Sequence, residues 1–76
     1  MAPVIEVVAG VSDTTNHPVV GLIAETSQVS EALPPYQLKV YSPIVEDGLV
    51  CWQVTFVGHY HSRDEAVRWF RKLFSR

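Results

Sequence analysis

The chain has 76 residues and a formal charge of −2, and hydrophobic residues make up 47% of it. This hydrophobic share is far above that of disordered chains, so we expect one folded domain, although so short a chain buries only roughly 60% of its unfolded surface. Cys51 is the only cysteine and cannot form an internal disulfide, which favours a reducing, cytoplasmic setting. The first residues have no basic segment and Glu6 interrupts their apolar run, so we expect no signal peptide. No apolar run is long enough for a membrane span, so we expect no membrane association.

The charge is distributed unevenly along the chain. Residues 1–62 carry one lysine against six carboxylates, a formal charge of −5, whereas residues 63–76 carry five cations against two carboxylates, +3. A basic end on an acidic body can orient a charged partner but does not by itself give affinity.

The first half of the chain predicts two strands. Residues 4–11 are rich in β-branched residues with apolar side chains at both parities, which is typical of a strand covered on both faces or of an inner strand with little exposure. Residues 12–18 contain turn-forming side chains and predict a loop, and residues 19–25 predict a second strand in which Gly21 marks a bulge or a close approach. Between Thr26 and Leu33 we expect at most one short helix, because Pro34 and Pro35 end it.

Residues 36–44 and 49–57 predict a hairpin whose loop length decides which side chains share a face. A two-residue turn, Asp47-Gly48, divides the apolar residues between the two faces. A three-residue loop, Glu46-Asp47-Gly48 with Gly48 in the left-handed region, keeps them together and is therefore predicted. The resulting pairs are Ile44 with Val50, Val40 with Val54, and Leu38 with Phe56.

In this register Trp52 lies on the core face of the hairpin, opposite Ser42. Pro43 cannot donate a ladder hydrogen bond, which favours an edge position for this third strand. The other face is mixed in polarity and consists of Gln37, Lys39, Tyr41, Cys51, Gln53, Thr55 and Val57.

Residues 62–75 carry the clearest local signals, those of a capped amphipathic helix. Ser62 and Glu65 have the spacing of a capping box. The apolar side chains fall within an arc of about 160° and are expected in the core; they are Ala66, Val67, Trp69, Phe70, Leu73 and Phe74. The predicted fold class is therefore α+β, an antiparallel sheet of three to four strands with one C-terminal helix packed on one face.

No residue pattern predicts catalysis or a cofactor. His59 and His61 alternate on a strand and could share a metal, but no third or fourth ligand is evident from Cys51 or His17, so no metal site is assigned. The chain has no nucleophile elbow, no Cys-His signature and no phosphate-binding glycine loop, so we expect no enzyme activity.

The cations of the final helix offer a nucleic-acid alternative in which Arg68, Arg71, Lys72 and Arg76 contact phosphates. The acidic overall charge and the assignment of the helix aromatics to the core weaken this alternative. Cations at a helix C-terminus are also favoured by the helix dipole.

Three resemblances bear on the second half. The stretch from Asp47-Gly48 to Ser62-Arg-Asp-Glu65-Ala66 resembles HicB-type antitoxins, and its strand-then-helix ending is similar to that of AP2-type DNA-binding domains, without their basic sheet face. The pattern Ser62-x-Asp64 followed by Trp69-Phe70-x-x-Leu73 resembles a segment of the small phage-encoded anti-CRISPR inhibitors. This last resemblance covers about a dozen residues and implies an inhibitor that acts by binding a protein complex.

The leading hypothesis is a non-enzymatic protein-binding module, a phage or plasmid inhibitor of a host complex, without a cofactor. Its predicted contact residues are Tyr41, Glu46, Asp47, Gln53, Thr55, Val57 and Tyr60. The alternatives are a nucleic-acid-binding or antitoxin-like regulatory module that uses the basic helix, and a homodimer formed by pairing of edge strands.

Overall fold

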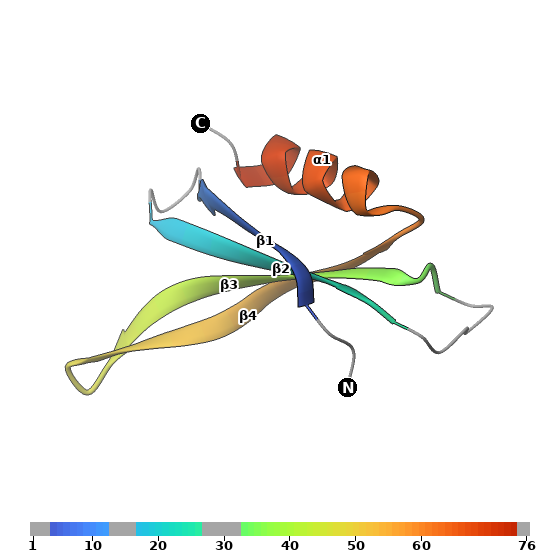
Figure 1. Ribbon diagram of the computed structural model, residues 1–76. Coiled ribbons are helices and arrows are strands. Elements are labelled where there is room, and N and C mark those ends of the chain that lie inside the picture. The colour runs from blue at the N-terminus through green and yellow to red at the C-terminus, as the bar shows by residue number, and fades with distance from the viewer. Residues whose placement is uncertain (1–3, 13–16, 27–32, 75–76) are drawn as a thin grey trace.

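The computed structural model describes residues 4–12, 17–26 and 33–74, which form four strands and one helix in these ranges. The elements are β1 (Val4–Val11), β2 (Pro18–Glu25), β3 (Tyr36–Glu46), β4 (Leu49–Tyr60) and α1 (Arg63–Phe74). The strands form one antiparallel sheet in the order β1-β2-β3-β4, and α1 lies across one of its faces (Figure 1). The predicted class is confirmed. The short helix expected between Thr26 and Leu33 falls on residues 27–32, which the structure does not describe.

The core lies between α1 and the middle of the sheet. Val19 and Ile23 of β2 and Leu38 and Val40 of β3 are fully buried. From the helix, Ala66 and Phe70 are buried against them, and Val8, Phe56, Tyr60, Val67 and Phe74 pack around this centre. One helix on a four-stranded sheet therefore gives a core on one side of the sheet only.

Two glycines let the helix approach the sheet closely. A Cβ atom at Gly21 would lie 2.9 Å from the Phe70 ring, and one at Gly10 would lie 2.5 Å from the Phe74 carbonyl oxygen. Side chains larger than hydrogen would push the helix away from β1 and β2, so the expected close approach at Gly21 is confirmed.

The helix begins where its capping residue predicts. The Glu65 backbone N–H donates to Ser62 Oγ at 3.1 Å, which satisfies one of the unpaired donors of the first turn. The predicted burial of the whole apolar arc is wrong, because Trp69 is 40% exposed and Leu73 is 39% exposed. The sheet covers the side of α1 that carries Ala66 and Phe70, and the remaining part of the arc lies at the margin of the contact.

The hairpin turn has two residues, not the predicted three. Asp47 and Gly48 both have positive φ, 54° and 77°, the combination of a type I′ turn, and Glu46 pairs with Leu49. The left-handed conformation expected for Gly48 is confirmed, but the predicted pairs of Ile44, Val40 and Leu38 are wrong.

A β-bulge on β4 compensates for the turn. Val40 pairs with Phe56 whereas the next residue, Tyr41, pairs with Val54, so Thr55 has no partner in the ladder. Thr55 Oγ1 lies 3.0 Å from Ser42 Oγ and 3.4 Å from the Val40 carbonyl oxygen. The extra residue brings Phe56 onto the core side next to Val40, which a regular ladder from the same turn would not do.

Two predicted strand positions are also corrected. The third strand, β3, is an inner strand between β2 and β4, although its pairing with β2 ends at Tyr41, so Pro43 lies in a stretch that has β4 alone as its neighbour. The first strand, β1, was expected to be an inner strand and is instead an edge strand paired with β2.

In the part of the chain that the structure describes, no helix is long and apolar enough to cross a membrane.

Candidate functional site

The face of the sheet that points away from α1 carries most of the exposed large apolar side chains of the described strands, and we call it the outward face. Strand alternation and the pairing register assign its members. They are Val4, Val7, Ala9 and Val11 of β1, Val20, Leu22 and Ala24 of β2, Gln37, Lys39, Tyr41, Pro43 and Val45 of β3, and Val50, Trp52, Val54, Val57 and His59 of β4.

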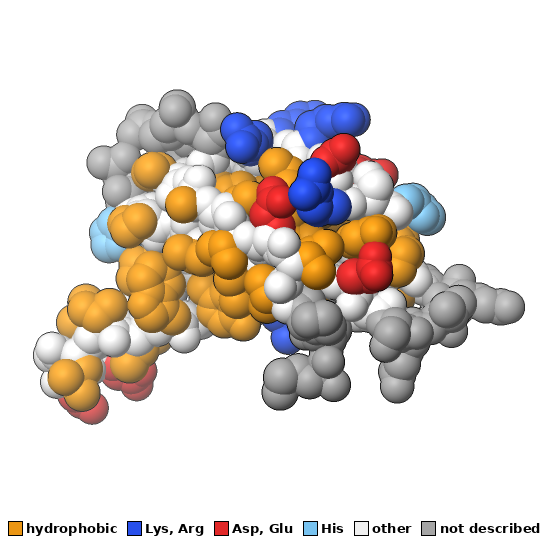
Figure 2. All heavy atoms as spheres, in the orientation of Figure 1, with side chains coloured by type: hydrophobic (Ala, Val, Ile, Leu, Met, Phe, Trp, Pro, Cys, Tyr) orange, Lys and Arg blue, Asp and Glu red, His pale blue; other side chains and the backbone are white. Residues whose placement is uncertain are grey.

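This face is apolar, and no element of the described chain covers it. Seven of its large side chains are between 42% and 74% exposed: Val4, Val7, Val45, Val50, Trp52, Val54 and Val57. Together they offer on the order of 500 Å² of apolar surface, which is near the upper end for a single patch on a monomeric protein. In the view of Figure 2, hydrophobic side chains extend from the strands below the helix along the β3–β4 hairpin, whereas Lys and Arg side chains gather over α1.

Lys39 lies within this apolar surface. Its register neighbours are Leu22 on β2 and Val57 on β4, and it is half-buried between them. Among the described strand residues that point to the outward face, Lys39 is the one Lys, Arg, Asp or Glu. A charged group at the centre of an apolar patch is a specific feature, because a partner that covers it must supply a counter-charge or leave it unpaired.

The predicted contact residues do not form one site. Tyr41 and Val57 belong to the outward face as expected. Gln53 and Thr55 lie on the opposite side, with Gln53 paired to Ser42 and the Thr55 hydroxyl beside that of Ser42. The bulge is the physical reason. It reverses the facing of the β4 residues between it and the turn, relative to the predicted register, and leaves the facing of the β3 residues unchanged.

The same reversal places Cys51 and Trp52 on the faces opposite to those predicted. Trp52 pairs with Pro43 on the outward face and is 51% exposed, whereas Cys51 pairs with Ile44 on the other side and carries a free, exposed thiol. Trp52 is therefore a surface residue of the hairpin and not part of the core.

The remaining predicted contact residues lie at opposite ends of β4. Glu46 and Asp47 are at the hairpin tip, and Tyr60 is at the last position of the strand, next to the helix. The Tyr60 ring stacks on Trp69, with centroids 6.5 Å apart. Partial burial, and secondarily the nearby Glu65 carboxylate, raise the pKa of the Tyr60 hydroxyl above its ordinary value.

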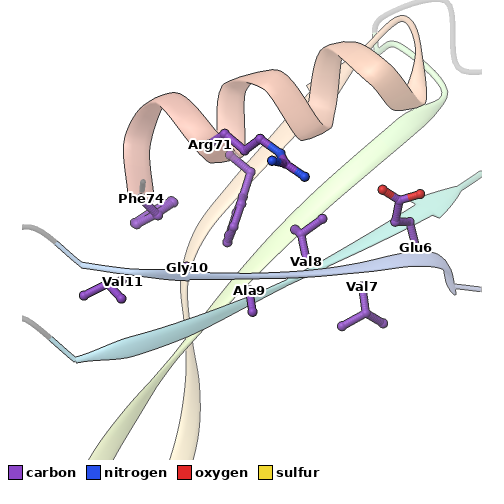
Figure 3. Close-up of a pocket in the computed structure, with 9 residues that line it drawn as sticks. Glu6, Val7, Val8, Ala9, Gly10, Val11, Arg71 and Phe74 are labelled. Carbon is purple, nitrogen blue, oxygen red and sulfur yellow. The ribbon is translucent and has the colours of Figure 1, made fainter. Parts of the chain in front are cut away.

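Of the helix cations proposed for nucleic-acid binding, Arg68, Arg71 and Lys72 are three and four residues apart and therefore share the exposed side of α1. The Lys72 ammonium lies 4.9 Å from the centre of the Trp69 ring at one margin of this side. Arg71 lies at the other margin, facing β1 (Figure 3). Arg68 is exposed, and Arg76 lies outside the described residues. Arg68 lies between Arg71 and Lys72 on the helix surface, so the three described cations share one side of α1, and the nucleic-acid alternative stays a prediction.

The histidine pair does not assemble a metal site with other residues. Among the described residues there is no group of three or more His, Cys, Asp or Glu side chains that could hold a metal ion. His59 Nε2 instead lies 3.4 Å from Gln37 Nε2, across the β3–β4 ladder.

Comparison of this chain with protein-family models, with curated proteins and with solved structures gave no match. The sequence interpretation missed Val7, Trp52 and Val54 as members of the outward face. The apolar residues at both parities of β1 were a usable signal, since they indicate a strand meant to be covered on both faces.

Proposed function

We propose that this chain is a non-enzymatic protein-binding module that uses the outward face to cover an apolar surface of a larger protein assembly. The observation that carries the proposal is a sheet with one face covered by α1 and the other apolar and open. Burial of exposed apolar area is the main favourable term in protein association, and a patch of this size on so small a chain is typical of an interaction site.

Lys39 indicates the chemistry of the partner. The partner surface should be apolar with one carboxylate positioned opposite the Lys39 ammonium, because an unpaired cation removed from water costs several kcal/mol. Trp52 and Tyr41 supply the large, rigid aromatic side chains that commonly carry most of the binding energy.

The finer proposal is an inhibitor that blocks a host complex by occupying such a surface in the cytoplasm. The resemblance of residues 62–73 to anti-CRISPR inhibitors supports the inhibitor role, and the free exposed thiol of Cys51 fits a reducing compartment.

The test compares capture of host proteins by the wild-type chain and two matched variants. Val54→Lys places a charge in the outward face, and Leu49→Lys places the same charge on an equally apolar residue of β4 on the other side of the sheet. We expect a stoichiometric protein partner that wild type and Leu49→Lys retain and that Val54→Lys loses. Lys39→Glu should weaken the same complex by at least tenfold, because the introduced carboxylate would face the carboxylate proposed on the partner and repel it.

Circular dichroism should show all variants folded. Leu49 and Val54 are exposed strand positions, where a substitution changes stability by about 1 kcal/mol, and Lys39→Glu exchanges one charged side chain for another. Capture of the same proteins by all variants, or recovery of no stoichiometric partner, would contradict the proposal.

A further inference from the structure

A groove of about 410 Å³ runs between the helix and the first strand. Six consecutive residues of β1, Glu6–Val11, form one wall, and Phe70, Arg71 and Phe74 of α1 form the other. In Figure 3, Val8 points from β1 toward the helix, whereas Val7, Ala9 and Val11 point away from it. The groove therefore follows the length of the strand and is distinct from the outward face.

The strand that lines the groove is an edge strand. In the described sheet, β1 pairs with β2 on one side, so every second residue on its other side turns its N–H and C=O groups toward open space. Six residues of strand span about 20 Å. An extended segment of five or six residues can lie along this edge and complete its main-chain hydrogen bonds.

The groove also has side-chain features that can select such a segment. The partly exposed Val8 and Phe74 side chains provide an apolar floor, and the buried Phe70 ring packs beneath Phe74 at 5.3 Å between centroids. Gly10 lets Phe70 and Phe74 lie directly against the β1 backbone, because it has no side chain beneath them.

Arg71 gives the groove a charge preference. Among the described residues the arginine that forms ion pairs is Arg63, which holds Glu6 at 3.1 Å and Asp64 at 3.2 Å. Glu6 is thus compensated by Arg63, and Arg71, which extends over the groove between Phe74 and Glu6, has no carboxylate partner in the described part of the chain.

We propose that this groove binds an extended peptide segment of a partner protein as an additional strand next to β1. The segment presents an apolar residue to Val8 and Phe74 and, two positions along on the same side, a glutamate or aspartate to Arg71. Residues two apart on a strand point to the same side, so both contacts are made by one short segment. The main chain supplies most of the affinity, and the apolar-x-acidic spacing supplies selectivity.

The experiment titrates the isotopically labelled chain with the peptide acetyl-Thr-Val-Thr-Glu-Thr-amide and follows backbone amide resonances. We expect saturable shifts in β1 and in the second half of α1. Replacing Glu by Gln in the peptide should weaken binding at least fivefold. Two peptides, each methylated on the backbone nitrogens of every second residue, separate the two edges of the added strand. Methylation of the nitrogens that face β1 should abolish binding, and methylation of the alternate set should not change it.

Arg71→Gln and Arg68→Gln are the matched protein variants, since both residues are exposed arginines of α1 and Arg71 is the one that lines the groove. Arg71→Gln should lower affinity for the Glu peptide at least fivefold without changing affinity for the Gln peptide, and Arg68→Gln should change neither. Val54→Lys on the outward face should also leave peptide binding unchanged, which separates this site from the proposed function.

The proposal is overturned if no saturable shifts occur up to millimolar peptide, if the shifts map to β4, or if both arginine variants have equal effects. Sedimentation at the same concentration tests whether a second copy of this chain occupies the groove instead. A dimer whose interface maps to β1 would show that a second copy fills the groove, and this too would overturn the proposal.

Discussion

Replacing Phe70 and Trp69 separately by alanine tests how the helix is held on the sheet. Both residues belong to the apolar arc of α1, but Phe70 is 1% exposed and Trp69 is 40% exposed. Phe70 lies over Gly21 and within contact of Phe74, whereas Trp69 stacks on Tyr60 and carries Lys72 above its ring. The neighbouring positions therefore differ in what alanine removes.

The expected magnitudes follow from this burial. Truncating a fully buried phenylalanine costs about 3–5 kcal/mol, including the cavity that it leaves. Trp69 loses a partly exposed ring and one stacked pair, which together are worth about 1–2 kcal/mol. A chain of this length has a total unfolding free energy of about 4–11 kcal/mol, so Phe70→Ala should leave the fold marginal or lost and Trp69→Ala should leave it intact.

The assay is urea denaturation followed by far-ultraviolet circular dichroism, which does not depend on the tryptophan that one variant lacks. Phe70→Ala should lower the midpoint by at least twice as much as Trp69→Ala. Equal losses in the two variants would refute the reasoning, because they would mean that the whole arc is buried, as helical periodicity alone predicts.

Two further predictions concern the turn and a titrating group. Gly48→Ala should destabilise the chain by about 1–2 kcal/mol, because Gly48 has φ of 77° and nothing within 4 Å of an added Cβ, so backbone strain is the sole cost. Thermal melting should show this loss as a lower melting temperature. Asp47→Gly, at φ of 54°, should not lower the melting temperature. Equal melting temperatures for Gly48→Ala and wild type would contradict the type I′ turn. Burial, and then Glu65, raise the pKa of Tyr60 in the folded state, so the folded chain holds this proton more tightly than the unfolded chain. That contribution to stability is fully present below pH 10, the ordinary tyrosine value, and is lost as pH rises through the higher folded pKa. Urea midpoints of wild type should therefore fall more steeply above pH 10 than those of Tyr60→Phe, and parallel curves would contradict the shift.

The helix and the number of strands could be predicted because local signals define them. Ser62 caps the first turn through a contact three residues away, and the spacing of Ala66 and Phe70 follows from helical periodicity. The burial of Trp69 could not be predicted in the same way. It depends on where the helix crosses the sheet, and that position depends on Gly10 and Gly21, which are distant in sequence.

The hairpin shows a different limit. Asp47-Gly48 is a strong local signal for a two-residue turn, but the apolar pattern of the two strands favours the longer loop, which keeps the apolar residues on one face. The protein keeps the short turn and inserts Thr55 as a bulge, so that Phe56 reaches the core while Trp52 and Val54 turn outward. A bulge depends on the pairing of two strands, and no pattern within either strand alone reveals it.

The pattern of β1 ties the two proposed surfaces together. Its apolar residues at both parities are typical of a strand covered on both faces, yet α1 covers the Val8 and Gly10 side alone, and Val7 on the other side is 62% exposed. Among the described strands, its outer edge has no neighbour either, beside the groove under Arg71. A partner on the outward face would supply the missing second layer, and an added strand would supply the missing neighbour. The pattern is then satisfied by the assembled state, in which β1 becomes the inner, doubly covered strand that its sequence predicts.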